Sequence, residues 1–81
     1  MSTATVQVFA SYAELLGANT IQIVLPDGAT VDDVVAAVRG TPGGESLPSQ
    51  LKIAVNREFA GPHQPVSARD ELALIPPVAG G

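Results

Sequence analysis

The group best suited to chemistry in this sequence is the carboxylate of the last residue. The chain ends in Gly80-Gly81, so no side chain surrounds that carboxylate and another protein's active site could close around it. The sequence contains no cysteine, which excludes disulfides, thiolate nucleophiles and a persulfide carried on a side chain. A carboxylate is a poor electrophile, because it is anionic and its oxygen is a poor leaving group, so it must be activated before it reacts. We therefore single out the terminal carboxyl of Gly81 as the candidate reactive group.

The segment before the two glycines is stiff and apolar. It has the sequence Ile-Pro-Pro-Val-Ala over residues 75–79, and its prolines end any strand and hold the backbone extended. We divide the chain into a folded domain over residues 1–77 and an extended tail over residues 78–81. The tail reaches at most about 14 Å, which is enough to enter a partner's pocket. Gly80 provides clearance, because a side chain there would collide with the walls of a narrow channel.

Composition limits the partners and the cofactors that we expect. The chain has 81 residues, of which 46% are hydrophobic and 4% aromatic, so it forms one small domain with an aliphatic core. The net charge is −4, and the four basic residues are scattered, which argues against nucleic acid and anionic membranes as partners. The N-terminus lacks the pattern of a signal peptide and no apolar run is long enough to span a membrane, so we expect a cytoplasmic protein. The single histidine, His63, has no second histidine with which to share a metal, so we expect no metal and no permanently bound cofactor.

Hydrophobic periodicity predicts a mixed α+β domain. A capping box at Thr30 and Asp33 begins the clearest helix, and Gly40 ends it. Residues 41–49 form the longest loop, which we expect to be mobile. The predicted strands cover residues 5–10, 20–25, 51–55, 58–60 and 71–75, with a short helix over residues 11–16. This order is typical of a roll in which one sheet wraps a single long helix, with the first and last strands side by side at its centre.

Strand alternation also predicts an apolar patch on the open face of the sheet. If Val6 and Val8 face the helix, Phe9 faces the other way, and Ile75 does the same on the neighbouring strand. Phe59 could join them from the sheet edge. An apolar patch on an open sheet face usually marks a partner's docking site. The alternative is that Phe9 and Phe59 are partly covered structural residues.

Four segments together resemble a known family. They are Val-Phe-Ala at residues 8–10, Leu-Pro-Asp-Gly-Ala-Thr-Val at residues 25–31, Ile-Ala-Val-Asn at residues 53–56, and Asp-Glu-Leu-Ala-Leu-Ile-Pro-Pro-Val-Ala-Gly-Gly at residues 70–81. The whole chain resembles the small subunit of molybdopterin synthase, a β-grasp, ubiquitin-like sulfur carrier. It departs from the family at Ala13, where an arginine is common, and at residues 68–70, where Asp-Gly-Asp is common.

The resemblance implies a cycle in which Gly81 carries sulfur. A ubiquitin-activating-like adenylyltransferase uses ATP and magnesium to adenylate Gly81, and a sulfur donor protein converts the adenylate to a thiocarboxylate. The tail then enters the active site of the large synthase subunit and donates sulfur to cyclic pyranopterin monophosphate, which forms the molybdopterin dithiolene. The chain would be a non-catalytic subunit whose partners supply the catalytic groups. Besides the apolar patch, the residues expected to contact those partners are Pro76, Pro77, Val78 and Ala79.

Three other functions are compatible with the same residues. The chain could carry sulfur for thiamine, cysteine or tRNA thiolation, because such carriers share the fold and the Gly-Gly end. It could modify proteins, with Gly81 joined to a target lysine by an isopeptide bond. It could also be an interaction module whose tail is inert.

Overall fold

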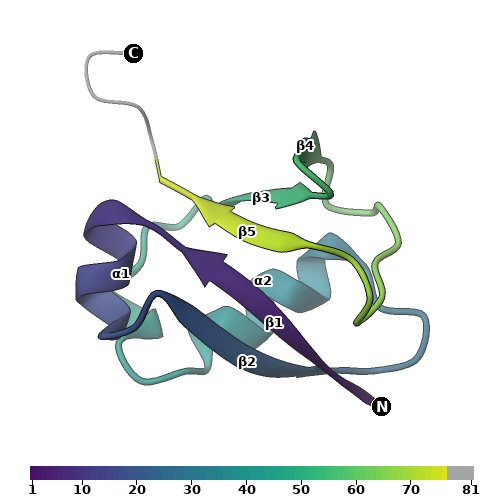
Figure 1. The fold of residues 1–81 in the computed structure, drawn as a ribbon, viewed down its shortest axis with the longest axis horizontal. Coiled ribbons are helices and arrows are strands. Elements are labelled where there is room, and N and C mark those ends of the chain that lie inside the picture. The colour runs from purple at the N-terminus through teal and green to yellow at the C-terminus, as the bar shows by residue number, and fades with distance from the viewer. Residues whose placement is uncertain (77–81) are drawn as a thin grey trace.

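The fold is a five-stranded mixed sheet wrapped on one main helix, as expected from the sequence (Figure 1). The computed structural model describes residues 1–76. The strand order is β2-β1-β5-β3-β4; β1 and β5 are parallel and the other neighbours are antiparallel. The elements are β1 (Ser2–Val8), α1 (Ala10–Leu16), β2 (Thr20–Leu25), α2 (Val31–Arg39), a 3-10 helix η1 (Gly44–Ser46), β3 (Lys52–Val55), β4 (Glu58–Ala60) and β5 (Leu72–Ile75).

The first strand and first helix differ slightly from the prediction. β1 ends at Val8, and α1 already begins at Ala10. Phe9 has extended backbone angles and serves as the N-cap of α1. The strand therefore ends two residues before residue 10, where the alternation of side chains had predicted its end. Gly17 ends the helix in the left-handed conformation, one residue after the predicted helix over residues 11–16.

Helix α2 is held by its packing. Thr30 is its N-cap, and the predicted capping box is present, with the Thr30 backbone N–H donating to the Asp33 carboxylate at 2.8 Å. Val31, Val34 and Val38 form a buried stripe on one side of the helix. Because valine is a mediocre helix former, this stripe contributes more to the helix than intrinsic propensity does.

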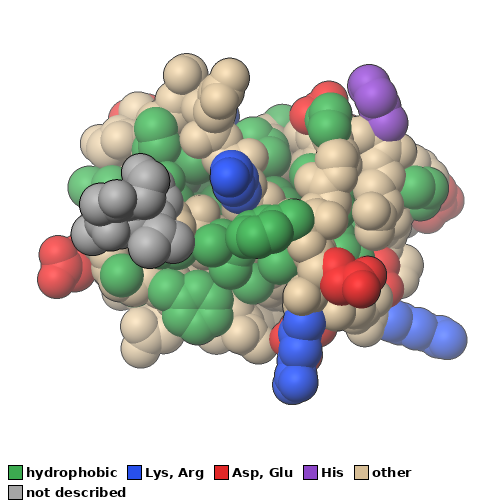
Figure 2. Space-filling model, turned by 90° about the horizontal axis from the view of Figure 1, so that it is seen from above, with side chains coloured by type: hydrophobic (Ala, Val, Ile, Leu, Met, Phe, Trp, Pro, Cys, Tyr) green, Lys and Arg blue, Asp and Glu red, His purple; other side chains and the backbone are tan. Residues whose placement is uncertain are grey.

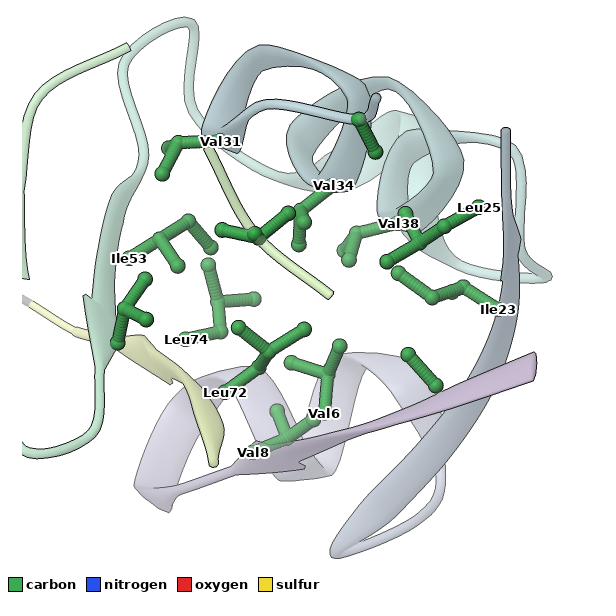
Figure 3. Close-up of a cluster of buried hydrophobic side chains, with 14 of the residues drawn as sticks. Val6, Val8, Ile23, Leu25, Val31, Val34, Val38, Ile53, Leu72 and Leu74 are labelled. Atoms are coloured by element: carbon green, nitrogen blue, oxygen red, sulfur yellow. The ribbon is translucent and has the colours of Figure 1, made fainter. Parts of the chain in front are cut away.

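The core lies between α2 and the inner face of the sheet. Figure 3 shows side chains from both layers pointing toward one another. The central strands supply the floor, since Val6, Leu72 and Leu74 are fully buried. Every residue of the core except Tyr12 is aliphatic, as the composition predicted.

The segment after α2 is packed against the domain and includes a short helix, which corrects the prediction of a loop throughout residues 41–49, while its mobility stays a prediction. It contains η1, and the Arg39 guanidinium donates hydrogen bonds to the backbone carbonyls of Pro48 at 2.6 Å and Ser49 at 2.8 Å. Arg39 therefore does more than complement the negative end of the helix, because it fastens the chain that leads into β3. Gly43 has a φ of 87° and lies against the backbone of Leu15.

Gly44 is predicted to tolerate no side chain. An added Cβ would lie 2.4 Å from the Val38 carbonyl oxygen and 2.6 Å from that of Arg39. Since both obstacles are backbone atoms, we expect Gly44→Ala to lower the free energy of unfolding by about 1–3 kcal/mol. Chemical denaturation measures this change, and Gly61→Ala is the control because its added Cβ meets no atom within 4 Å. Equal stability of the two variants would contradict the close contact.

Among the helices in residues 1–76, none combines the length and the apolar character needed to cross a membrane.

Candidate functional site

The parallel pairing of β1 and β5 determines where the tail begins. Both strands run in the same direction, so their carboxyl ends lie together at the same end of the sheet, the edge formed by the strand ends (Figure 1). Ile75 ends β5, and the half-buried Pro76 is the last residue that the structure describes. Pro77, the last residue of the predicted domain, and the predicted tail residues Val78, Ala79, Gly80 and Gly81 lie outside the described part of the chain.

A hollow of about 250 Å³ lies on the outer face of the sheet, next to this edge. Its floor follows one row of cross-strand pairs, in which Gln7 of β1 pairs with Ala73 of β5 and Ala73 pairs with Ala54 of β3. Ala54 in turn pairs with Phe59 of β4. Because the two central residues are alanines, the sheet surface is low there, and larger side chains stand around it.

The structure brings Phe9, Phe59 and Ile75 together as walls of this hollow. Phe9 is 44% exposed and Phe59 is 70% exposed, so neither is a covered structural residue. Ile75 is half-buried. These three side chains therefore share the outer face of the sheet, as predicted. Their role in docking a partner remains a prediction. In the view of Figure 2, hydrophobic side chains gather across the middle of the surface, with a basic side chain among them.

Charged groups border the hollow and were not singled out by the sequence. Lys52 pairs with Ile75 across the strands, and its Nζ lies 5.6 Å from the centre of the Phe59 ring, within the range of a cation–π interaction. At the other end, Arg57 Nε donates to a Glu71 carboxylate oxygen at 3.3 Å. The neighbours of Lys52 could not be known without the register between β3 and its partner strands.

The hairpin that carries Phe59 is fastened to the start of β5. Asn56 and Arg57 both have positive φ, at 53° and 72°, and form the turn between β3 and β4. The Asn56 side chain accepts the Glu71 backbone N–H at 2.9 Å and donates to Asp70 Oδ1 at 3.0 Å. Asp70 Oδ2 also accepts the Ser67 backbone N–H at 2.8 Å. These hydrogen bonds hold the pKa of Asp70 below its usual value. The one from Asn56 has the largest effect, and the one from the Ser67 backbone has the second largest.

This lowered pKa predicts an acid-sensitive contribution to stability. A carboxyl whose pKa falls on folding stabilises the protein fully above its unfolded pKa, and the contribution is lost as the pH falls through the folded pKa. We expect Asp70→Asn to lower the melting temperature at neutral pH, with the difference from the native protein shrinking below about pH 4. Thermal unfolding of both proteins across this range measures the effect. A difference that does not change with pH would show that the charge of Asp70 contributes nothing.

A second, larger depression lies on the other side of Ile75. This open cleft has a volume of about 860 Å³ and is lined by residues that include Tyr12, Val35, Leu51 and Lys52. Ile75 lines both the cleft and the hollow, so a partner that surrounds the start of the tail contacts Ile75 from either side. We take the hollow as the candidate docking site, because its exposed aromatic side chains are of the kind that anchors interfaces.

Comparison with known proteins identifies the family. The model of the ThiS family matches residues 6–81, nearly the whole chain. The chain belongs to the ThiS family. Small archaeal modifier protein 1 of Haloferax volcanii is 36% identical, with the match covering 93% of this chain and 97% of that protein. A crystal structure of that modifier protein superposes with a TM-score of 0.84 at 32% identity, covering 96% of this chain and 100% of the other, which confirms the β-grasp fold.

A second ThiS-family relative supports the resemblance seen in the sequence. The molybdopterin synthase sulfur carrier subunit of Arabidopsis thaliana is 35% identical, with the match covering 94% of this chain and 80% of that protein. A complex of subunits 1 and 2 of the molybdopterin-converting factor from Helicobacter pylori shares the fold, with a TM-score of 0.69 at 20% identity over 99% of this chain and 100% of the other. The relatives thus bear two kinds of name, sulfur carrier and protein modifier.

Proposed function

We propose that this chain is the sulfur carrier and small subunit of a molybdopterin synthase. The observation that carries the proposal is its similarity, along nearly its whole length, to a molybdopterin synthase sulfur carrier subunit. The Gly80-Gly81 end and the absence of cysteine agree with it, because they leave the terminal carboxyl as the group able to carry sulfur. An exposed aromatic hollow beside the start of the tail supplies a surface for the large subunit.

The proposed chemistry activates Gly81 in two steps. A carboxylate oxygen of Gly81 attacks the α-phosphorus of ATP on the adenylyltransferase, with magnesium, and pyrophosphate leaves. The outer sulfur of a persulfide on a donor protein then attacks the acyl carbon and AMP leaves, which gives an acyl disulfide. A thiol cleaves its S–S bond by forming a disulfide with the donor sulfur, and the thiocarboxylate is released. Its sulfur goes to cyclic pyranopterin monophosphate in the active site of the large subunit. Gly80 leaves space around the reacting carbon, and Pro77, Val78 and Ala79 span the distance to the folded domain.

The domain's role in this cycle is to deliver the tail. Phe9, Phe59 and Ile75 surround a hollow with an alanine floor, so an apolar side chain of the large subunit can be buried there. Lys52, beside Phe59 and opposite Ile75, would face an acidic group of the partner. The solved complex of subunits 1 and 2 of the molybdopterin-converting factor from Helicobacter pylori contains a chain of the same fold.

The proposal is tested by mass spectrometry of the reaction product. The chain is incubated with its adenylyltransferase, ATP, magnesium and a sulfur source, and one terminal oxygen should be replaced by sulfur. Omitting ATP is the control, because no leaving group then forms. An unchanged mass, in a mixture that thiolates another carrier, would rule out sulfur carriage. Co-purification of the large synthase subunit separates this pathway from thiamine, cysteine or tRNA thiolation.

Protein modification is a second candidate, favoured by the similarity to a small archaeal modifier protein. In that function a target lysine amine attacks the activated carbon of Gly81, AMP leaves, and an isopeptide bond forms. Digested cell proteins would then carry a remnant of residues 80–81 on lysine. Finding this remnant only when Gly81 is intact supports modification, and its absence leaves sulfur transfer as the function.

A further inference from the structure

The two edges of the sheet differ in their ability to accept another strand. In the described residues, β2 and β4 form the edges. β4 has three residues and includes Glu58, and short length and charge both discourage strand addition. A proline follows each edge strand, Pro26 after β2 and Pro62 after β4, so proline does not distinguish the two edges. β2 has six residues, and neither β2 nor β1 contains a charged residue or a proline. The edge at β2 therefore lacks these protections.

β2 lies at one edge of the sheet, beside β1 alone (Figure 1), so alternate backbone groups along it face away from any strand. The Val8 N–H donates to the Asn19 carbonyl at 2.8 Å, so these two residues form a hydrogen-bonded pair at the start of the β1–β2 ladder. Hydrogen-bonded and non-hydrogen-bonded pairs alternate along an antiparallel ladder. With the observed register, the N–H and C=O groups of Gln22 and Val24 point away from β1. In residues 1–76, no backbone bond outside the ladder involves these two residues.

The side chains of β2 also favour pairing with a strand of the same kind. The strand has the sequence Thr-Ile-Gln-Ile-Val-Leu, and Val24 is 56% exposed on its outer face. Six-residue segments of this composition, with high strand propensity and without charge or proline, pair with copies of themselves when they are exposed. The net charge of −4 makes two copies repel in general, but β1 and β2 contribute no charge to that repulsion.

We propose that β2 pairs antiparallel with β2 of a second copy of this chain, joining the two sheets into one. A two-fold axis at Gln22 sets it opposite Gln22 of the partner subunit and sets Thr20 opposite Val24 of the partner subunit. The two-fold pairing uses up the open edge of each copy, and β4 discourages further addition, so association stops at the dimer. The hollow lies on other strands and stays open in both copies. This inference is independent of the proposed function.

Sedimentation of the full-length chain tests the dimer. Because two single strands bury little surface, we expect a weak dimer whose fraction rises up to millimolar concentration. Gln22→Lys sets like charges opposite each other and should raise the dissociation constant about threefold to tenfold. Gln64→Lys makes the same charge change in an exposed loop and should leave the constant unchanged. A monomer at every concentration, an assembly larger than a dimer, or a dimer unaffected by Gln22→Lys would each overturn the proposal.

Disulfide trapping tests the register directly. The native chain has no cysteine, so Gln22→Cys can form a disulfide only between two copies. In a hydrogen-bonded antiparallel pair the two Cα atoms lie about 5.5 Å apart, which a disulfide can bridge. Under mild oxidation Gln22→Cys should cross-link much faster than Gln64→Cys. Equal rates for the two variants would overturn the proposed pairing.

Discussion

Deleting Gly81 is expected to abolish sulfur transfer and leave the fold unchanged. The deletion moves the terminal carboxylate back by about 3.5 Å. A displacement of about 1 Å can cost about 100-fold in rate, so we expect a loss of at least that size in thiocarboxylate formation. The buried core lies between Ala4 and Leu74, so the melting temperature should be the same as that of the native chain. Mass spectrometry measures the transfer, and thermal unfolding measures the stability.

Gly80→Ala separates the reach of the tail from the clearance around the Gly81 carboxylate. This variant keeps the length of the chain and the Gly81 carboxylate but adds a methyl group beside it. If clearance matters, thiocarboxylate formation falls although the reach is unchanged. For the deletion of Gly81, a shortened chain that still supports cofactor synthesis at the native rate would disprove the role of that residue.

Phe59→Ala is expected to weaken binding to the large synthase subunit by about 2–4 kcal/mol, which is at least about 30-fold in the dissociation constant. Phe59 is 70% exposed in the isolated chain, so its truncation should change folding stability by no more than about 0.5 kcal/mol. It forms one wall of the hollow, and its ring lies beside the Lys52 ammonium group. Titration calorimetry with the large subunit measures the change in affinity.

Leu15→Ala is the matched control for the docking surface. Leu15 is 44% exposed, the same fraction as Phe9, but it lies outside the hollow. We expect Phe9→Ala to weaken binding and Leu15→Ala to leave it unchanged. Equal losses for these two variants would indicate a general effect of apolar surface and would contradict a specific hollow.

Local periodicity was enough to predict the strands, the main helix and the face on which Phe9 and Ile75 lie, whereas Phe59 was only a possible addition from the sheet edge. Each of these depends on the spacing of residues that are close in the chain, such as the valine stripe of α2. The environment of Lys52 was not predictable, because it depends on the register between β3 and its two neighbours. The same holds for the alanine floor of the hollow, since Ala54 and Ala73 carry no local signal of a site.

The segment after α2 shows a different limit of sequence reasoning. Its glycines and prolines are typical of a free loop, and the prediction followed that composition. In the structure Gly43 and Gly44 allow close backbone contacts, and Arg39 reaches the carbonyl groups of residues 47–49. Glycine composition alone cannot distinguish freedom of the backbone from close approach to another segment.

The central position of β5 links folding to completion of the chain. This strand is the last to be synthesised, yet Leu72 and Leu74 are fully buried beside β1, which is the first. A ribosome-bound chain that lacks β5 has no central strand and no complete core, so the domain can fold only after nearly all of it has emerged. Nascent fragments thus cannot form the complete domain that would engage a partner. A correctly folded domain therefore requires that translation has passed Leu74.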